Sequence, residues 1–195
     1  ASGAALNVLD GGRLAAGAIL TADGSVNLFS AAVTLAALEG ASSGVVRLDS
    51  TTLTVGAGGF AGALVDGTGA PGALAKTTGG SLLLSGINLY TGATAVNAGV
   101  LSIESGGSLA SSSISVANTA ALNVQSGGLL NTMSSVSLDG VLNLLGSNVV
   151  LGSLNGASTG RVNRDGTALT LGTGVFNGVI ADLSASGSIE KVGAG

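Results

Sequence analysis

Two pentapeptides place a serine where many hydrolases hold their nucleophile. Gly40–Gly44 reads GASSG and Gly156–Gly160 reads GASTG, and both match G-x-S-x-G. That chemistry requires a strained turn between a strand and a helix, together with a histidine base. The chain contains no histidine, so Ser42 and Ser158 lack the usual base. We therefore expect both segments to be structural turns.

A glycine-rich segment, Gly67–Gly72, reads GTGAPG and matches the dinucleotide fingerprint G-x-G-x-x-G. A dinucleotide site needs a strand before the glycines and a helix after them, because the helix N-terminus binds the pyrophosphate. Pro71 and its flanking glycines favour a loop instead. The sequence therefore predicts a loop over 67–72.

The carboxylates stand singly, mostly beside a glycine or a predicted turn. They are Asp10, Asp23, Glu39, Asp49, Asp66, Glu104, Asp139, Asp165, Asp182 and Glu190. Calcium sites need several converging oxygen ligands, as in D-x-D loops or regular Asp-containing nonapeptides, and neither pattern occurs. We interpret these residues as turn caps and predict no metal, cofactor or catalytic residue.

Composition excludes several classes of protein. The net charge is −4, and the basic residues are scattered singly: Arg13, Arg47, Lys76, Arg161, Arg164 and Lys191. A nucleic-acid partner is not expected, because binding requires a basic stripe. No apolar run reaches the about 20 residues that a membrane-spanning helix needs. The chain has no cysteine, which excludes disulfides and thiolate metal sites. Its first residues do not resemble a signal peptide, so we expect either that a leader has been removed or, as we favour, that the chain is a segment of a longer protein.

A long internal repeat has a period of 116 residues. Ala4–Leu14 (AALNVLDGGRL) returns as Ala120–Leu130 (AALNVQSGGLL), and Asp49–Gly62 returns as Asp165–Gly178. Across residues 1–66 and 117–182, 30 of 66 paired positions are identical without a gap. We interpret residues 1–195 as one solenoid segment of about 1.7 units, residues 1–116 and the partial unit 117–195.

A shorter period of about 20 residues runs inside this unit. Leu101–Ile103, Leu122–Val124 and Leu142–Leu144 are apolar-polar-apolar triplets, and SGG follows the first two. Each triplet indicates a short strand with two residues facing inward, and the glycines permit the turns. The pattern predicts an all-β fold: either antiparallel hairpins or, as we favour, a β-solenoid in which equivalent triplets stack. At about 4.8 Å per coil, the rod would be about 45 Å long.

The segment from Leu74 to Ile103 resembles the autotransporter-associated β-strand repeat of type V secreted passengers. That repeat reads approximately K-x-G-x-G-T-L-x-L-S-G-x-N-x-Y-x-G-x-T-x-V-x-x-G-x-L-x-V. The matching residues are Lys76, Gly80, Leu82, Leu84, Gly86, Asn88, Tyr90, Gly92, Thr94, Val96, Gly99, Leu101 and Ile103, and the motif restarts over 189–195 with Lys191. Thr78 stands where the family usually has glycine, so we expect an altered turn after Lys76.

The resemblance implies a right-handed parallel β-helix exported through an outer-membrane barrel and displayed on a Gram-negative cell surface. Within such a solenoid, alternation directs Leu82, Leu84 and Val96 inward. Tyr90 is either a core plug, which we favour, or a lone exposed contact. The two repeat copies also suggest a salt link between Asp66 and Lys76.

The asparagines at the centres of four triplets predict a further surface feature. Asn7, Asn27, Asn123 and Asn143 should stack as outward amide ladders, and a role in reading a ligand is a less favoured alternative.

Three functions remain to be weighed. The favoured one is a structural and adhesive rod within a surface passenger, anchored to the outer membrane by another part of the parent protein. Its partners would be other copies of itself, through edge or lateral contacts, or a host or abiotic surface. The alternatives are a polysaccharide-processing enzyme, which would need clustered acids and aromatic platforms, and an ice-binding solenoid, which would need a regular threonine array.

Overall fold

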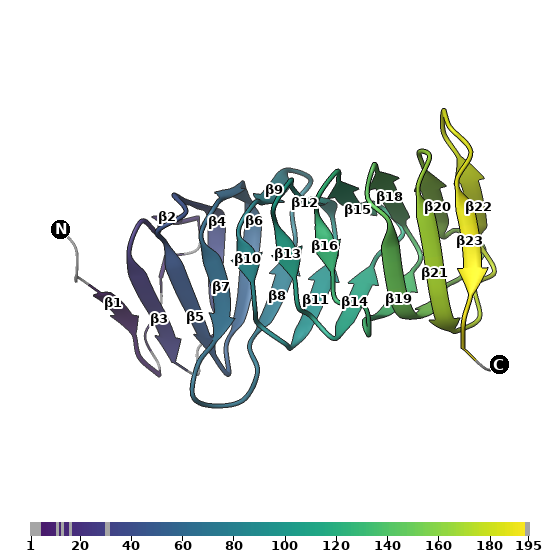
Figure 1. Cartoon of the computed structure of the whole chain (residues 1–195). Helices are drawn as coiled ribbons and strands as arrows, with labels where there is room; N and C mark the ends of the chain where they lie inside the picture. Colours follow the sequence, from purple (N-terminus) through teal and green to yellow (C-terminus); the bar gives the residue numbers. More distant parts are fainter. Residues whose placement is uncertain (1–4, 11, 13, 16, 30–31, 194–195) are drawn as a thin grey trace.

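The computed structural model describes residues 5–10, 12, 14–15, 17–29 and 32–193. Within these residues every regular element is a β-strand, and every pairing is parallel. The coils stack into about nine turns along one axis, with N- and C-termini at opposite ends (Figure 1). This confirms the predicted all-β solenoid and excludes the hairpin alternative, because hairpins pair antiparallel strands.

The strands are short, as expected from triplets separated by glycine turns. In chain order they are β1 (Ala5–Val8), β2 (Ile19–Thr21), β3 (Ser25–Phe29), β4 (Val33–Gly40), β5 (Val45–Asp49), β6 (Thr52–Phe60), β7 (Ala63–Asp66), β8 (Ala73–Lys76), β9 (Ser81–Leu84), β10 (Ile87–Asn88), β11 (Ala93–Val96), β12 (Gly99–Ile103), β13 (Ser108–Leu109), β14 (Ser113–Val116), β15 (Ala120–Gln125), β16 (Leu129–Leu130), β17 (Ser135–Leu138), β18 (Val141–Leu145), β19 (Val149–Asn155), β20 (Arg161–Arg164), β21 (Ala168–Thr173), β22 (Val179–Asp182) and β23 (Ser188–Lys191).

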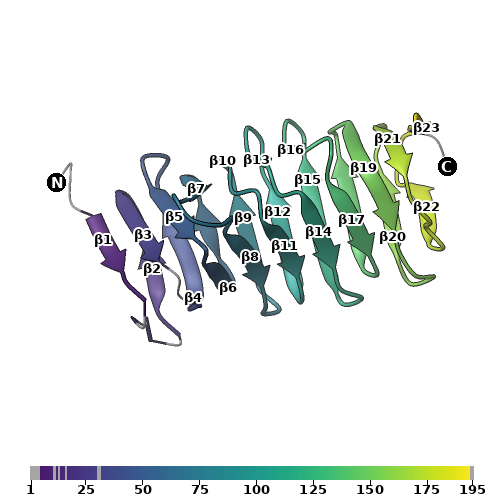
Figure 2. The same ribbon diagram turned by 90° about the horizontal axis from the view of Figure 1, so that it is seen from below.

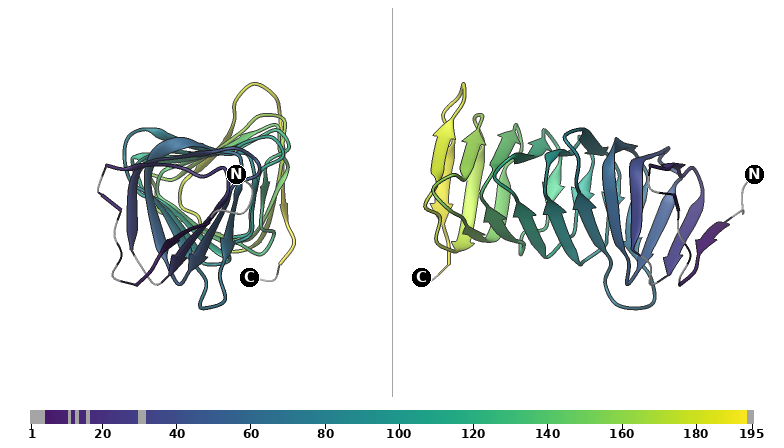
Figure 3. Two further views of the ribbon diagram at one scale, coloured as in Figure 1. Left: turned by 90° about the vertical axis from the view of Figure 1, so that its left-hand side faces the viewer. Right: turned by 180° about the vertical axis from the view of Figure 1, so that it is seen from behind.

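The strands form three faces around the tube, which Figure 3 shows along its axis. Face 1 contains β1, β3, β5 and β7, then β10, β13 and β16, then the first half of β19, the first half of β21, and β23. Face 2 contains the first halves of β4 and β6, then β8, β11, β14, β17 and the second half of β19. Face 3 contains β2, the second halves of β4 and β6, then β9, β12, β15, β18, β20 and β22. Figure 2 shows the same stack from below.

The core is a column of aliphatic side chains inside the tube. In the triplet strands the alternation is strict: β18 buries Leu142 and Leu144 while Asn143 is half-buried, and β14 buries Ile114 and Val116. Because each parallel register places one coil's inward residue over the next, apolar side chains stack from β3 to β21, with Lys76 and Arg164 as charged members of these inward columns. Burial of this column supplies the main stabilising free energy.

The 116-residue repeat in the sequence is matched by a repeat in strand pairing. Ala5 pairs with Ser25 and Asn27 with Arg47, and 116 residues later Ala121 pairs with Val141 and Asn143 with Asn163. The set β1–β3–β5–β7 therefore recurs as β15–β18–β20–β22.

The two sets do not lie on the same face. β1 starts at Ala5 on face 1, and the chain returns to that face at residues 25, 45, 63, 87 and 108 before it reaches residue 121 on face 3. One 116-residue shift therefore covers five turns plus two further faces, or five and two-thirds turns. Equivalent strands of the two copies are rotated by one face of the tube.

Candidate functional site

The apolar residues of the Leu74–Ile103 motif lie in the core. Leu82, Leu84 and Val96 are fully buried, as the alternation predicted, and so are Leu101 and Ile103. They belong to β9, β11 and β12, which pair in register with the coils on either side. These residues hold the coils together and present no side chain to the solvent.

Asn88 of the motif is a buried link between three coils. Its Oδ1 accepts a hydrogen bond from Leu64 N (3.1 Å), and its Nδ2 donates to Gly86 O (2.9 Å) and Ser108 O (3.0 Å). These three bonds satisfy the buried amide and link the backbone of three coils. The family resemblance placed Asn88 in the motif, but its burial was not predicted.

Tyr90 is the core plug that the sequence favoured. Its side chain is fully buried, and its hydroxyl lies 2.6 Å from Thr94 Oγ1, which is also buried. Burial raises the pKa of the Tyr90 phenol, the Thr94 hydrogen bond lowers it, and the charge of Asp66 raises it further. The phenol therefore stays neutral, and Tyr90 fills the core while its hydroxyl bonds Thr94.

The predicted salt link between Asp66 and Lys76 is wrong. Lys76 is buried, and its Nζ donates to Thr78 O (2.5 Å) and Ala98 O (3.0 Å). Burial lowers the pKa of this amine. Asp66 instead accepts from Gly72 N (2.9 Å), Thr91 N (3.0 Å) and Thr91 Oγ1 (2.7 Å). The two charges are satisfied separately: corner carbonyls accept from the ammonium, whereas turn amides and the Thr91 hydroxyl donate to the carboxylate.

The remaining motif residues lie at corners of the coils. Gly80, Gly86 and Gly92 precede β9, β10 and β11, and Gly99 begins β12 with a φ of 69°. At Gly86 a Cβ would lie 1.9 Å from Gly62 O, so only glycine allows the coils to approach this closely.

Two residues show how the motif begins in each copy. Thr78, the departure from the family pattern, donates from Oγ1 to Gly56 O (2.6 Å) and so bonds the preceding coil. Lys191 is exposed, and its Nζ donates to Gly193 O, as Lys76 does to Thr78 O.

The outward amide ladders are present. Asn27 Nδ2 donates to Asn7 Oδ1 (2.7 Å), and Asn143 Nδ2 donates to Asn123 Oδ1 (2.7 Å). Asn163, which was not predicted, extends the second ladder by donating to Asn143 Oδ1 (2.8 Å). The first ladder lies on face 1 and the second on face 3, since their strands belong to those faces.

Two buried hydroxyls form a shorter internal ladder that was also not predicted. Ser111 Oγ donates to Gly92 O (2.6 Å) and Ser134 Oγ donates to Ser111 O (2.6 Å). Serine inside a glycine- and serine-rich turn gives no sequence signal that distinguishes it from a solvated turn residue.

The two G-x-S-x-G segments form turns, as expected. Ala41 N donates to Asp23 Oδ1 (2.8 Å), and Ala157 N donates to Asp139 Oδ1 (3.1 Å) at equivalent positions of the repeat. Aspartate caps the turn in both cases. GTGAPG is the loop between β7 and β8, as expected.

Neither a metal site nor a membrane-spanning helix is found within the described ranges. Among these residues no three acidic, histidine or cysteine side chains converge as a metal site would require. Over the same part of the chain no helix is long and apolar enough to span a bilayer.

Comparison with known proteins gives a match to a bacterial adhesin. Over 146 residues, 62% of this chain, the sequence is 33% identical to the adhesin BmaC autotransporter of Brucella suis biovar 1 (strain 1330). The chain spans only 4% of that protein's length. No family model and no solved structure matches the chain. The chain is therefore a β-solenoid segment similar to part of an autotransporter adhesin, which confirms the resemblance to autotransporter passengers that its central motif indicated.

Proposed function

We propose that this chain is a rod segment of a bacterial surface adhesin, which mediates adhesion or self-association without catalysis. The observation that carries the proposal is the match to an autotransporter adhesin over most of the chain. By the same resemblance, another part of the parent protein anchors it to the outer membrane. A passenger needs an extended scaffold that remains folded outside the cell, and a stack of parallel coils provides one.

The internal hydrogen bonds support a scaffold role for the motif. Asn88, Tyr90 and Lys76 all bond groups inside the tube, so the most distinctive motif residues stabilise coils rather than contact a partner. The chain has no histidine, and Ser42 and Ser158 lie in aspartate-capped turns. These features favour a non-enzymatic segment.

The amide ladders are the surfaces best suited to lateral contact. After the ladder bonds, Asn143 and Asn163 each have one side-chain N–H left, and Asn123, which only accepts in the ladder, has two. Rungs on any two such rods share the same spacing of about 4.8 Å, so a second copy of the chain matches their period. We propose a second copy as the lateral partner of these faces.

Surface display tests this proposal. The chain would be displayed on Gram-negative cells through a heterologous barrel, beside an unrelated β-solenoid of equal length displayed at the same density. We expect the chain to increase both cell settling and retention on host cells or plastic. An Asn123→Ala/Asn143→Ala/Asn163→Ala variant should lose settling more than retention. Equal settling and retention for the chain and the unrelated solenoid would show that the segment is only a spacer.

A further inference from the structure

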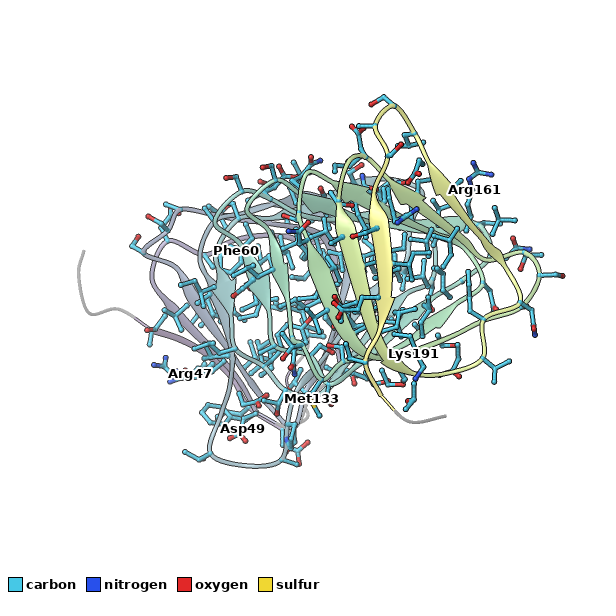
Figure 4. All side chains as sticks on the ribbon, turned by 45° about the vertical axis from the view of Figure 1, so that its right-hand side comes forward. Arg47, Asp49, Phe60, Met133, Arg161 and Lys191 are labelled. Atoms are coloured by element: carbon cyan, nitrogen blue, oxygen red, sulfur yellow. The ribbon has the colours of Figure 1, made fainter. Side chains whose placement is uncertain are left out.

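A groove lies on the outer side of face 1, where β3, β5 and β7 end. Its volume is about 320 Å³, and its lining residues are Asn27, Phe29, Arg47, Asp49, Asp66, Gly67 and Thr68. The β7–β8 loop forms one wall and projects from the rod in Figure 1. Figure 4 shows Arg47 and Asp49 outside the tube on the side of this loop.

The loop is held in place by the strand end below it. Gly69 N donates to Asp49 Oδ1 (2.6 Å), and Ala70 N donates to Ser50 Oγ (3.0 Å). Gly72 N bonds Asp66 Oδ1 (2.9 Å) at the other end of the loop. The wall of the groove is therefore fixed by side chains from two strands.

Several polar groups in the groove have capacity for a ligand. Among the described residues, the exposed guanidinium of Arg47 makes one long contact, from Nη1 to Asn27 Oδ1 at 3.5 Å. Within the same ranges only Oδ1 of the Asp49 carboxylate accepts a hydrogen bond. Phe29 is half-buried beside them and is the register partner of Asp49 on the neighbouring strand. The groove thus combines a partly exposed aromatic ring with donors and acceptors of both charges.

The second repeat copy shows which of these residues the fold requires. The positions equivalent to Asn27, Asp49 and Asp66 are Asn143, Asp165 and Asp182, which keep their types. The positions equivalent to Phe29 and Arg47 are Leu145 and Asn163, although the strand registers are the same. A leucine and an asparagine therefore satisfy the backbone at these positions, so folding does not demand the ring and the guanidinium.

We propose that this groove binds a neutral saccharide of one or two rings. The apolar C–H face of a sugar stacks on an aromatic ring, and its hydroxyls need mixed donors and acceptors. Two carboxylates against one guanidinium disfavour an anionic ligand. The volume is at the lower end of the range for small-molecule pockets, about 300–1,000 Å³. This inference rests on the proposed adhesive function, for which it names the class of partner.

The test is a titration of the isolated chain followed by amide chemical shifts in NMR spectra. Maltose, cellobiose and mannobiose are the neutral probes, and glucuronic acid is the anionic probe. At least one neutral disaccharide should shift the amides of Gly67, Thr68 and Gly69 with saturation at about 1 mM, the affinity expected of a small open groove. The variant Phe29→Leu/Arg47→Asn, which introduces the second copy's residues, should weaken binding roughly tenfold or more.

A matched control is Arg161→Asn, which removes an exposed arginine outside the groove and should leave binding unchanged. Melting curves would show that both variants remain folded. The proposal is overturned if no neutral sugar gives saturable shifts, if the double variant binds as well as the parent, or if glucuronic acid binds best. If the displayed chain adheres although no sugar binds, only the proposal of saccharide binding in the groove is overturned. If the displayed chain does not adhere, the proposed adhesive function itself is overturned.

Discussion

Residues 5–66 and 121–182 are two copies of one structural unit on different faces of the same tube. Both have an amide ladder and an aspartate-capped turn, and both enclose a phenylalanine among glycines. An added Cβ would lie 2.5 Å from Phe60 Cζ at Gly62 and 2.5 Å from Phe176 Cζ at Gly178. The contacts around each ladder, turn and phenylalanine therefore come from the neighbouring coils and do not depend on the face of the tube on which the strand lies.

The copies differ most at one inward position. Leu48 is fully buried in β5, whereas its equivalent in β20 is Arg164, also buried. Arg164 Nη2 bonds Asp182 Oδ1 (2.8 Å), while its Nε and Nη1 have no hydrogen-bond partner among the described residues. The second copy therefore has a buried charge that the first copy shows to be dispensable for the fold.

The largest effect should come from transferring this charge to the first copy. Leu48→Arg places a guanidinium at a core position where Asp66 already accepts bonds from Gly72 and Thr91. We expect a loss of about 3–5 kcal/mol in the free energy of unfolding, since a buried charge without a free partner is strongly destabilising. Urea denaturation measures it, with Arg47→Leu, an outward position of the same strand, as control. A loss below about 1 kcal/mol would show that the two sites are equivalent.

The two phenylalanines should differ in the next experiment. Phe60 is fully buried and visible inside the tube in Figure 4, whereas Phe176 is half-buried. Phe60→Ala should cost about 3–5 kcal/mol because it leaves a cavity, and Phe176→Ala should cost less than half as much. Equal costs from thermal or urea unfolding would contradict the burial difference between the copies.

Removing the charge from the second copy should stabilise it. Arg164→Leu introduces the first copy's residue and removes two buried nitrogens that have no hydrogen-bond partner in the described part of the chain. We expect a gain of about 1–3 kcal/mol, because a buried guanidinium is replaced by an apolar side chain while Asp182 is 38% exposed and still accepts from Gly187 N. Asp182→Asn in the parent should instead be destabilising, as it leaves the guanidinium without its carboxylate. A destabilised Arg164→Leu variant would mean that the arginine contributes net stability.

A smaller, pH-dependent effect concerns Tyr90, which lies in the coils between the two copies. Because burial raises the folded-state pKa above its ordinary 10.0, the folded chain retains the phenol proton at pH values where the unfolded chain releases it. Stability should therefore fall as pH rises above about 10. Tyr90→Phe should cost about 1 kcal/mol at neutral pH and show a shallower alkaline decline. Parallel declines in the two proteins would mean that the phenol titrates freely in the folded state.

Sequence patterns predicted which side chains are buried in the core and which stack between neighbouring coils. The burial of Leu82 and Leu84 and the ladders of Asn27 and Asn143 follow from alternation and the short period, whereas the plug formed by Tyr90 was predicted from the tendency of tyrosine to bury its ring. Asn163 was missed because RVNR lacks the apolar-polar-apolar pattern of the other rungs.

The face of each strand could not be predicted, because the turns vary in length. Ala5 and Ser25 pair across 20 residues, Val45 and Ala63 pair across 18, and Leu64 and Asn88 are bonded across 24. These differences arise in the loops. The short period of about 20 residues is an average over loops of different lengths, so it does not give the length of any single loop. The Asp66–Lys76 link failed for a related reason, since nearness in sequence does not show which corner groups surround a charge.

The central claim is that the 116-residue copies are rotated by one face, since β10 rather than β9 follows β7 on face 1. Leu89 N donates to Leu64 O (2.8 Å), which places residue 65 beside residue 89, whereas Leu83 lies on face 3. The chain has no cysteine, so engineered pairs can be oxidised without background. We expect Val65→Cys/Leu89→Cys to form an intramolecular disulfide and Val65→Cys/Leu83→Cys to remain reduced. The opposite result would place both copies on one face and contradict the account.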